Sequence, residues 1–230
     1  MPGQFAHIAN QDGTDLSYTD PLTGLGNIKR FFDKVDRLIH ERREDPAPFT
    51  VGIVDLDGFK PINDLFGRQA GDDILQQVAS RLKAALDGNA TVSRIGADEF
   101  AVLLPLTFSE DAALERARML IEVLSAPYDV GERMARLSAS VGCSLYAAGD
   151  DTTEILLSKA ESALYHAKHS GRGVVIVYTR EMEEAAKRVT RIEQALRRAV
   201  AASEVEPFFQ PIVDLETRQL LGFEALARWT

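Results

Sequence analysis

Hydrophobic residues follow two different spacings over roughly the first 180 positions of the chain. Apolar residues three or four positions apart predict helices, and short apolar runs that are continuous or alternating predict strands. The predicted helices cover about 27–45, 72–86, 109–124 and 152–168, and the predicted strands cover 49–56, 91–95, 100–104, 136–146 and 174–178. Strands that alternate with helices indicate an α/β sandwich, and the tight turn at Gly96 indicates some antiparallel pairing.

The strand predicted over 49–56 carries the first candidate chemistry. Its continuous apolar run is typical of a strand buried on both faces and therefore central in its sheet. Asp55 and Asp57 stand two positions apart at its end, so their side chains leave the same face. Two such carboxylates suit a hard divalent cation that keeps substrate phosphates as its other ligands. They could equally cap the following helix or be hydrated at the strand end.

The last fifty residues have a different organisation. Apolar residues at helical spacing predict one helix over 181–202 with a single buried face. Two strands are predicted after it, 207–215 and 220–229, around a turn at 216–218. Two strands with an apolar face do not form a stable domain alone.

Composition narrows the function classes. With 230 residues, of which 45% are hydrophobic, the chain can bury one full core and retain an appendage. A net charge of -9 argues against nucleic acid or an anionic membrane as partner, although one nucleotide could still be held through a metal ion. Cys143 is the only cysteine, which excludes a disulfide framework and favours the cytoplasm. No run approaches the length of a membrane span, so no membrane contact is expected.

Several motifs occur in a fixed order. They are Asp20-Pro21-Leu22-Thr23-Gly24-Leu25-Gly26-Asn27, the run from Asp55 to Asp64, Gly71-Asp72, Arg94-Ile95-Gly96-Ala97-Asp98-Glu99-Phe100, the run from Ala163 to Lys168, and Gly171-Arg172-Gly173. In order and spacing, residues 16–178 resemble the GGDEF family. The resemblance implies a nucleotidyl-cyclase-like α/β fold with a central mixed sheet flanked by helices. We expect this domain at 18–179, after a lead-in of 1–17.

The resemblance also implies an activity and a site. Members of the family condense two GTP molecules, each held by one subunit of a homodimer, into cyclic di-GMP with Mg²⁺ or Mn²⁺ as cofactor. Metal ligands would be Asp55, the Leu56 carbonyl and Asp98, and Glu99 would assist a second metal ion or deprotonate the attacking hydroxyl. The residues expected to contact GTP are Lys60, Lys168 and Arg172 at the phosphates, Asn63 and Asp72 at the guanine edge, and Gly96 and Ala97 along the backbone.

Several of these assignments have a simpler alternative. Lys168 and Arg172 could be solvated cations at a helix end, where the helix dipole favours them. Asn63 and Asp72 could be helix caps, because both precede candidate helical stretches. Glu99 could be a solvated hairpin residue.

Two departures from the family pattern bear on activity. Ala97 stands where the family has a second glycine, which lets the backbone approach the nucleotide and adopt a positive φ. Its methyl group could crowd GTP or shift Asp98. The inhibitory product site of the family falls on Asp87-Gly88-Asn89-Ala90, which lacks both key side chains, so feedback through it is not expected. Two hypotheses remain: a cyclase with weak turnover, or a GTP-binding regulatory module without catalysis.

The tail carries a second resemblance. The runs from Phe209 to Asp214 and from Phe223 to Trp229 resemble the opening of an EAL phosphodiesterase domain. We therefore expect a linker helix at 180–203 and the start of an EAL domain at 204–230, with the missing part of that domain as a partner in the full-length protein. In that family Glu224 would be a metal ligand and Arg228 a phosphate contact. The remaining ligands would lie beyond Thr230, so this chain is not expected to hydrolyse cyclic di-GMP.

Overall fold

A computed structural model describes residues 18–44, 47–86, 88–105, 107, 109–131, 133–146, 152–202 and 204–229. The expected lead-in of 1–17 lies outside the described residues, as does Asp87 of the expected inhibitory site. The chain divides into two compact units, Met1–Thr179 and Arg180–Thr230.

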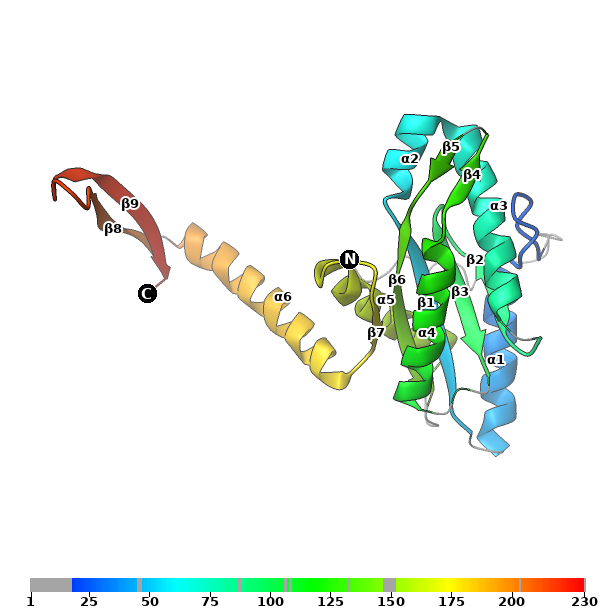
Figure 1. The fold of residues 1–230 in the computed structure, drawn as a ribbon. Coiled ribbons are helices and arrows are strands. Elements are labelled where there is room, and N and C mark those ends of the chain that lie inside the picture. The colour runs from blue at the N-terminus through cyan, green and yellow to red at the C-terminus, as the bar shows by residue number, and fades with distance from the viewer. Residues whose placement is uncertain are drawn as a thin grey trace. The chain divides into compact units, whose positions relative to one another are not determined.

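The first unit is built on a five-stranded sheet (Figure 1). Its strands in spatial order are β2 (Thr91–Arg94), β3 (Glu99–Leu104), β1 (Phe49–Asp57), β6 (Ser138–Tyr146) and β7 (Val175–Val177). All neighbours pair antiparallel except β6 and β7, which are parallel. The sheet is therefore mixed, and the central, doubly buried position predicted for β1 is confirmed.

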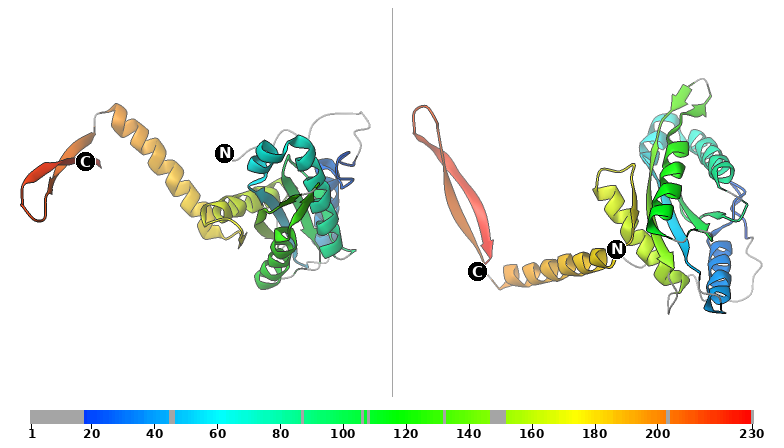
Figure 2. Two further views of the ribbon diagram at one scale, coloured as in Figure 1. Left: turned by 45° about the horizontal axis from the view of Figure 1, so that its top comes forward. Right: turned by 60° about the horizontal axis from the view of Figure 1, so that its bottom comes forward.

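Helices cover both faces of this sheet, as Figure 2 shows from two directions. On one face, α1 (Ile28–Glu44) and α5 (Thr153–His169) pack apolar side chains against Val51 and Ile53 of β1. On the other, α3 (Arg68–Ala85) and α4 (Glu110–Ser125) pack against Val54 and Leu56. Successive residues of a strand point to opposite faces, so β1 contributes to both halves of the core.

Three helix starts are capped by the side chains of the residues before them. The Asn27 side chain accepts a hydrogen bond from the Arg30 amide (3.1 Å), as expected for a cap of α1. Ser109 caps α4, and Thr152 caps α5 by accepting from the Ile155 amide at 3.4 Å. Thr153, the other candidate for the α5 cap, instead donates its hydroxyl to Asp36 at 2.5 Å.

Three short elements of the structure were not predicted from the hydrophobic pattern. These are α2 (Phe59–Phe66) and the hairpin of β4 (Tyr128–Val130) and β5 (Arg133–Ala135). α2 is bracketed by Gly58 and Gly67, whose φ values of 82° and 87° turn the chain at both ends. α2 has eight residues, and β4 and β5 have three each, which is too few for a helical or strand spacing of apolar residues to be recognised. The helix predicted from position 72 also begins earlier, at Arg68.

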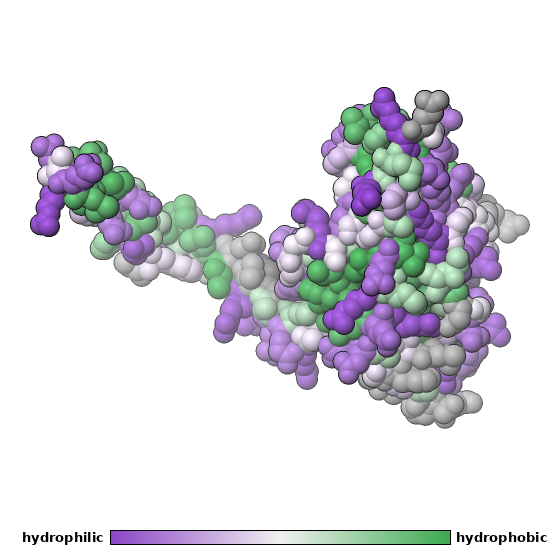
Figure 3. Space-filling model, in the orientation of Figure 1, coloured by the Kyte–Doolittle hydropathy of each residue, from purple (hydrophilic) through white to green (hydrophobic). Residues whose placement is uncertain are grey.

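The second unit consists of α6 (Arg180–Ala201) and an antiparallel pair, β8 (Val205–Val213) and β9 (Leu220–Trp229). The predicted helix and two strands are confirmed. The turn between the strands is fixed by Asp214, whose carboxylate accepts hydrogen bonds from the amides of Glu216 and Thr217. Hydrophobic surface shows on this hairpin in Figure 3, and its exposed large apolar side chains include Phe208, Phe209, Leu221 and Phe223.

None of the helices that the structure describes is long and apolar enough to cross a membrane.

Candidate functional site

The predicted site residues gather at the carboxyl end of β1. Asp55 lies opposite Glu99 of β3 on one side and opposite Ser140 of β6 on the other. The Leu56 amide donates a hydrogen bond to the Asp98 carbonyl oxygen at 3.2 Å. The central position of β1 thus brings Asp55, Leu56, Asp98 and Glu99 together, although about forty residues separate the two motifs.

Lys168 joins this cluster from the last turn of α5. Its ammonium group lies 2.6 Å from a carboxylate oxygen of Asp55, whose residue is only 6% exposed. Burial raises the pKa of the Asp55 carboxyl, the hydrogen bond and charge of Lys168 oppose that rise, and the nearby charges of Asp98 and Asp57 add to it. The net direction of the pKa shift is upward, chiefly because of burial. The alternative of a merely solvated helix-end cation is wrong for Lys168.

Glu99 occupies a similar environment at the first position of β3. Burial raises the pKa of its carboxyl, the charge of Asp55 raises it further, Lys168 opposes the rise and Asp98 adds to it. A Cβ atom at Gly96 would lie 2.7 Å from a carboxylate oxygen of Glu99, so this glycine leaves room for the Glu99 side chain. Half-buried and surrounded by charge, Glu99 is not a simple solvated hairpin residue.

The donor set of the cluster suits a hard divalent cation. Carboxylate and carbonyl oxygens are the ligands that Mg²⁺ prefers, and it usually keeps water and substrate phosphates as further ligands. Over the described ranges, no three His, Cys, Asp or Glu side chains are arranged to hold a metal ion together. The expected set of Asp55, Asp98 and the Leu56 carbonyl consists of oxygen donors of this kind.

Arg94, for which the sequence predicted no role, holds the turn between β2 and β3. The Arg94 guanidinium donates to the Ala97 carbonyl at 2.7 Å and to the Asp20 carboxylate at 3.3 Å. Asp20 in turn accepts from the amide and hydroxyl of Thr23. Asp20 is the first residue of the motif at 20–27, and Arg94 is the first residue of the motif at 94–100. Their places in these motifs were the sequence signal that could have indicated a role for them.

Ala97 itself is exposed and does not have a positive φ, and neither does Gly96. The positive φ that a glycine would permit at position 97 is therefore not adopted by Ala97. What remains of the expected effect of Ala97 is steric, because its methyl group stands beside Asp98 on the exposed side of the turn.

Asn63 and Asp72 lie within helices rather than before them. Asn63 is the fifth residue of α2 and Asp72 the fifth of α3, and the positions that precede the two helices are Gly58 and Gly67. The capping interpretation is therefore wrong for both. A Cβ atom at Gly71 would lie 1.8 Å from the side-chain oxygen of Asn63, so α3 approaches that amide closely beside Asp72.

The two remaining predicted phosphate contacts lie on exposed surface. Lys60 is in the first turn of α2, directly after β1. Arg172 follows α5, has a positive φ of 62°, and holds its guanidinium 3.9 Å from a carboxylate oxygen of Asp57. The side chain of Arg172 is 65% exposed, which leaves it accessible to a ligand.

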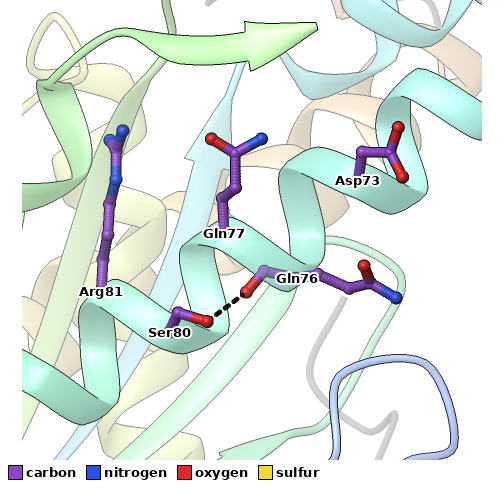
Figure 4. Close-up of a pocket in the computed structure, with 5 residues that line it drawn as sticks. All are labelled: Asp73, Gln76, Gln77, Ser80 and Arg81. Atoms are coloured by element: carbon purple, nitrogen blue, oxygen red, sulfur yellow. Dashed lines mark hydrogen bonds between the residues drawn. The ribbon is translucent and has the colours of Figure 1, made fainter. Parts of the chain in front are cut away.

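A surface hollow on α3 is not part of this cluster (Figure 4). Asp73, Gln76, Gln77, Ser80 and Arg81 line it. The Arg81 guanidinium donates hydrogen bonds to the carbonyls of Ala126 and Pro127. The Gln77 side-chain amide donates to the Asp129 carbonyl and accepts from the Asp129 amide. These side chains tie α3 to the segment at β4, a structural role.

In the second unit, the predicted EAL residues Glu224 and Arg228 are both exposed on β9. They are four positions apart, so their side chains leave the same face of the hairpin. They lie opposite Gln210 and Glu206 of β8.

Comparison with known proteins gives the same two-part division. The family model described as "Diguanylate cyclase, GGDEF domain" matches residues 17–174, and the model described as "EAL domain" matches residues 193–230. In Pseudomonas aeruginosa, the bifunctional diguanylate cyclase/cyclic di-GMP phosphodiesterase MucR is 34% identical over 96% of this chain, and the cyclic di-GMP phosphodiesterase NbdA is 33% identical over 91%. The chain spans only 32% and 27% of the lengths of these two relatives.

Solved structures are similar to the first unit. The GGDEF domain of PA1120 (TpbB or YfiN) from Pseudomonas aeruginosa superposes with a TM-score of 0.70 at 33% identity, covering 74% of this chain and 99% of that one. The GGDEF domain of DgcB from Caulobacter crescentus, in complex with c-di-GMP, superposes with a TM-score of 0.65 at 25% identity, covering 72% and 98%.

Proposed function

The chain belongs to the GGDEF family of cyclic di-GMP signalling, with the start of an EAL domain after it, and we propose that its first unit binds GTP with Mg²⁺ and condenses two GTP molecules into cyclic di-GMP. The observation that carries this proposal is the convergence of Asp55, Asp98 and Glu99 with Lys168 at the end of the central strand. Such a concentration of partly compensated buried charge is typical of a functional site.

The proposed reaction is an in-line displacement that occurs twice in a dimer of this chain. The 3′-oxygen of one GTP forms a bond to the α-phosphorus of the other, the bond from that phosphorus to the bridging oxygen breaks, and pyrophosphate leaves. The hydroxyl proton must leave the attacking oxygen. Two such steps convert two GTP molecules into cyclic di-GMP and two pyrophosphates.

In this proposal the acidic residues divide the work. Asp55, Asp98 and the Leu56 carbonyl hold Mg²⁺, or Mn²⁺ in its place, which supplies charge neutralisation for the triphosphate when bound. Glu99 accepts the hydroxyl proton or supports a second ion, and burial, which raises the pKa of its carboxyl, favours a group that can take up a proton. Lys60, Lys168 and Arg172 contact the phosphates through charge-assisted hydrogen bonds.

The guanine edge is assigned to Asn63 and Asp72. An amide offers a donor and an acceptor, and a carboxylate accepts from the guanine N–H groups, so the pair suits guanine better than adenine. The close packing of Asn63 on Gly71 supports this assignment, because it fixes the amide beside Asp72.

A second candidate function is a GTP-binding regulatory module without turnover. Ala97 favours it, since a methyl group at the turn beside Asp98 could reduce catalysis without removing a ligand. The EAL match at 193–230 also favours it, because nucleotide occupancy could then control a phosphodiesterase domain through α6.

Calorimetry with 3′-deoxy-GTP, which lacks the attacking hydroxyl, tests the binding step without turnover. We expect binding to require Mg²⁺, to be at least about tenfold tighter than that of 3′-deoxy-ATP, and to be lost in Asp55→Ala. Asp55→Asn serves as a less disruptive variant if the alanine variant does not fold. Asp111→Ala, at an exposed carboxylate in the first turn of α4, is the matched control. If the wild type and both Asp55 variants bound 3′-deoxy-GTP with equal affinity, Asp55 could not be a ligand of the nucleotide-bound metal ion.

A further inference from the structure

The second carboxylate of β1, Asp57, has a different environment from Asp55. Its side chain is 8% exposed and accepts hydrogen bonds from the Ser140 hydroxyl at 2.9 and 3.0 Å. One of its oxygens also accepts from the Gly173 amide at 3.1 Å. Asp57 is therefore turned toward β6 and the loop that follows α5.

That loop holds Arg172 in a backbone conformation that needs support. Gly171, Arg172 and Gly173 have φ values of 112°, 62° and 63°. A left-handed arginine costs free energy, unlike the glycines beside it, and persists only where the surroundings fix it. The Arg172 amide is bonded to the Ala167 carbonyl at 3.2 Å, and the next amide along the chain is the one bonded to Asp57.

The same carboxylate also lies near the arginine side chain. The Arg172 Nε atom is 3.9 Å from the other oxygen of Asp57, too far for a hydrogen bond but close enough for charge attraction. Asp57 thus contacts the loop twice, once through the backbone and once through charge, while most of the Arg172 side chain stays exposed. Ser140 completes the arrangement, because its hydroxyl also accepts from the Gly173 amide at 3.2 Å.

We propose that Asp57 is a positioning residue for Arg172: it fixes the 171–173 loop so that the guanidinium points to the terminal phosphates of the nucleotide. The inference rests on the proposed GTP site and extends it to a residue outside the metal and base contacts. It separates the two carboxylates of β1 by role, with Asp55 at the metal and Asp57 at the phosphate-binding loop.

The inference makes a specific demand on ligand chemistry. If Asp57 acts only through Arg172, its removal must weaken the binding of nucleotides that carry terminal phosphates and leave GMP unaffected. General damage to the site would weaken GMP as well. Asp57→Asn should retain part of the effect, because an amide oxygen can still accept from Gly173 but the charge attraction to Arg172 is lost.

The experiment is a double-mutant cycle on the full chain, with affinities for 3′-deoxy-GTP and GMP measured by calorimetry. Asp57→Ala and Arg172→Ala are each expected to weaken 3′-deoxy-GTP by about tenfold. The double variant should be no weaker than the more affected single variant, and Asp57→Asn should lie between Asp57→Ala and the wild type. Asp111→Ala is again the matched control.

Amide hydrogen exchange in the nucleotide-free protein gives an independent readout. Exchange at Gly173 should accelerate in Asp57→Ala and less in Asp57→Asn, while Gly142 in the centre of the sheet keeps the wild-type rate. A folding defect would accelerate both amides.

Each of three results would overturn the inference. In the first, the losses of 3′-deoxy-GTP affinity in Asp57→Ala and Arg172→Ala multiply in the double variant. In the second, Asp57→Ala weakens GMP binding as much as 3′-deoxy-GTP binding, and in the third the exchange rate of the Gly173 amide is unchanged in Asp57→Ala. Failure of the proposed function has a different signature, namely nucleotide binding that Asp55→Ala leaves intact. A protein that loses 3′-deoxy-GTP with Asp55→Ala but not with Asp57→Ala would retain the function and reject the role of Asp57.

Discussion

At the scale of single residues, the site concentrates negative charge where the protein excludes water. Asp55 and Glu99 both have raised pKa values, chiefly because burial disfavours the charged form of a carboxyl. A fold selected for stability alone has no reason to keep such a cluster at the end of its central strand. This cost agrees with the proposed binding of a divalent cation and the nucleotide phosphates at this place.

Glu161 shows the same effect outside the predicted site. It lies on α5 seven residues before Lys168, and burial followed by the charge of Glu99 raises the pKa of its carboxyl above 4.5. A carboxyl whose folded pKa is raised destabilises the folded state once it ionises. The penalty is absent below the unfolded pKa, grows as pH rises toward the folded pKa, and is constant above it.

We therefore expect Glu161→Gln to raise the free energy of unfolding at pH 7, with the gain disappearing below about pH 4.5. Urea denaturation at the two pH values measures this. Glu115→Gln, at an exposed glutamate of α4, is the control and should change little. A gain that is the same at both pH values would mean that ionisation of Glu161 is not its cause.

Motifs revealed the charged residues of the site but not their partners. Asp55, Glu99 and Lys168 stand in quoted motifs, and the structure brings them together. The contacts of Asp57 could not be predicted in the same way, because Ser140 and Gly173 are 83 and 116 positions away and sheet register decides their proximity. The backbone conformation of Ala97 could not be predicted for a related reason, because the φ angle of a turn residue depends on how the two strands pair.

At the scale of elements, periodicity predicted the long helices and the buried strands because their apolar faces repeat over many residues. It missed α2, which places Lys60 and Asn63, because a short helix between two glycines shows too little of a pattern. The capping interpretation of Asn63 followed from that omission, and the capping interpretation of Asp72 followed from placing the start of α3 at position 72 instead of Arg68. Helices and strands were thus predictable where they bury a large apolar face. The short helix α2 at the site was not, because the glycine turns at Gly58 and Gly67 set its limits and it has too few apolar residues to show a pattern.

The packing of α5 on β6 gives a prediction at this scale. A Cβ atom at Gly142 would lie 2.2 Å from the Ala160 carbonyl oxygen and the Leu164 amide nitrogen, both backbone atoms of α5. We expect Gly142→Ala to displace α5, to lower the free energy of unfolding by about 3 kcal/mol and to weaken nucleotide binding, because Lys168 belongs to the displaced helix.

Thermal or urea denaturation together with nucleotide titration measures both effects. Gly88→Ala is the matched control, since a Cβ atom there meets open space. If Gly142→Ala were as stable as Gly88→Ala, α5 could not be packed on β6 as closely as the structure shows.

At the scale of the whole molecule, the chain combines an α/β unit with the start of an EAL domain. The first unit has hydrophobic cores on both faces of its own sheet. The second unit has one helix and one hairpin with many exposed apolar side chains, too little to form a stable domain alone. Stability and nucleotide binding should therefore both reside in the first unit.

Removal of residues 180–230 tests this division. The shortened chain, ending at Thr179, should keep the melting temperature of the first unit and the affinity for 3′-deoxy-GTP within about twofold, because its core and site residues are all retained. Calorimetry and thermal denaturation of the two chains side by side provide the comparison. A large loss of either property would mean that α6 or the hairpin contributes to the first unit.

Product formation from GTP and Mg²⁺ tests the central claim most directly, with the wild type and Ala97→Gly compared at several protein concentrations. We expect the wild type to form cyclic di-GMP. The rate per chain should rise with protein concentration, because two chains must meet. The Ala97→Gly variant should form product faster than the wild type, with a similar affinity for GTP. Tight, Mg²⁺-dependent GTP binding without cyclic di-GMP from either protein at any concentration would contradict the cyclase assignment and favour the regulatory module.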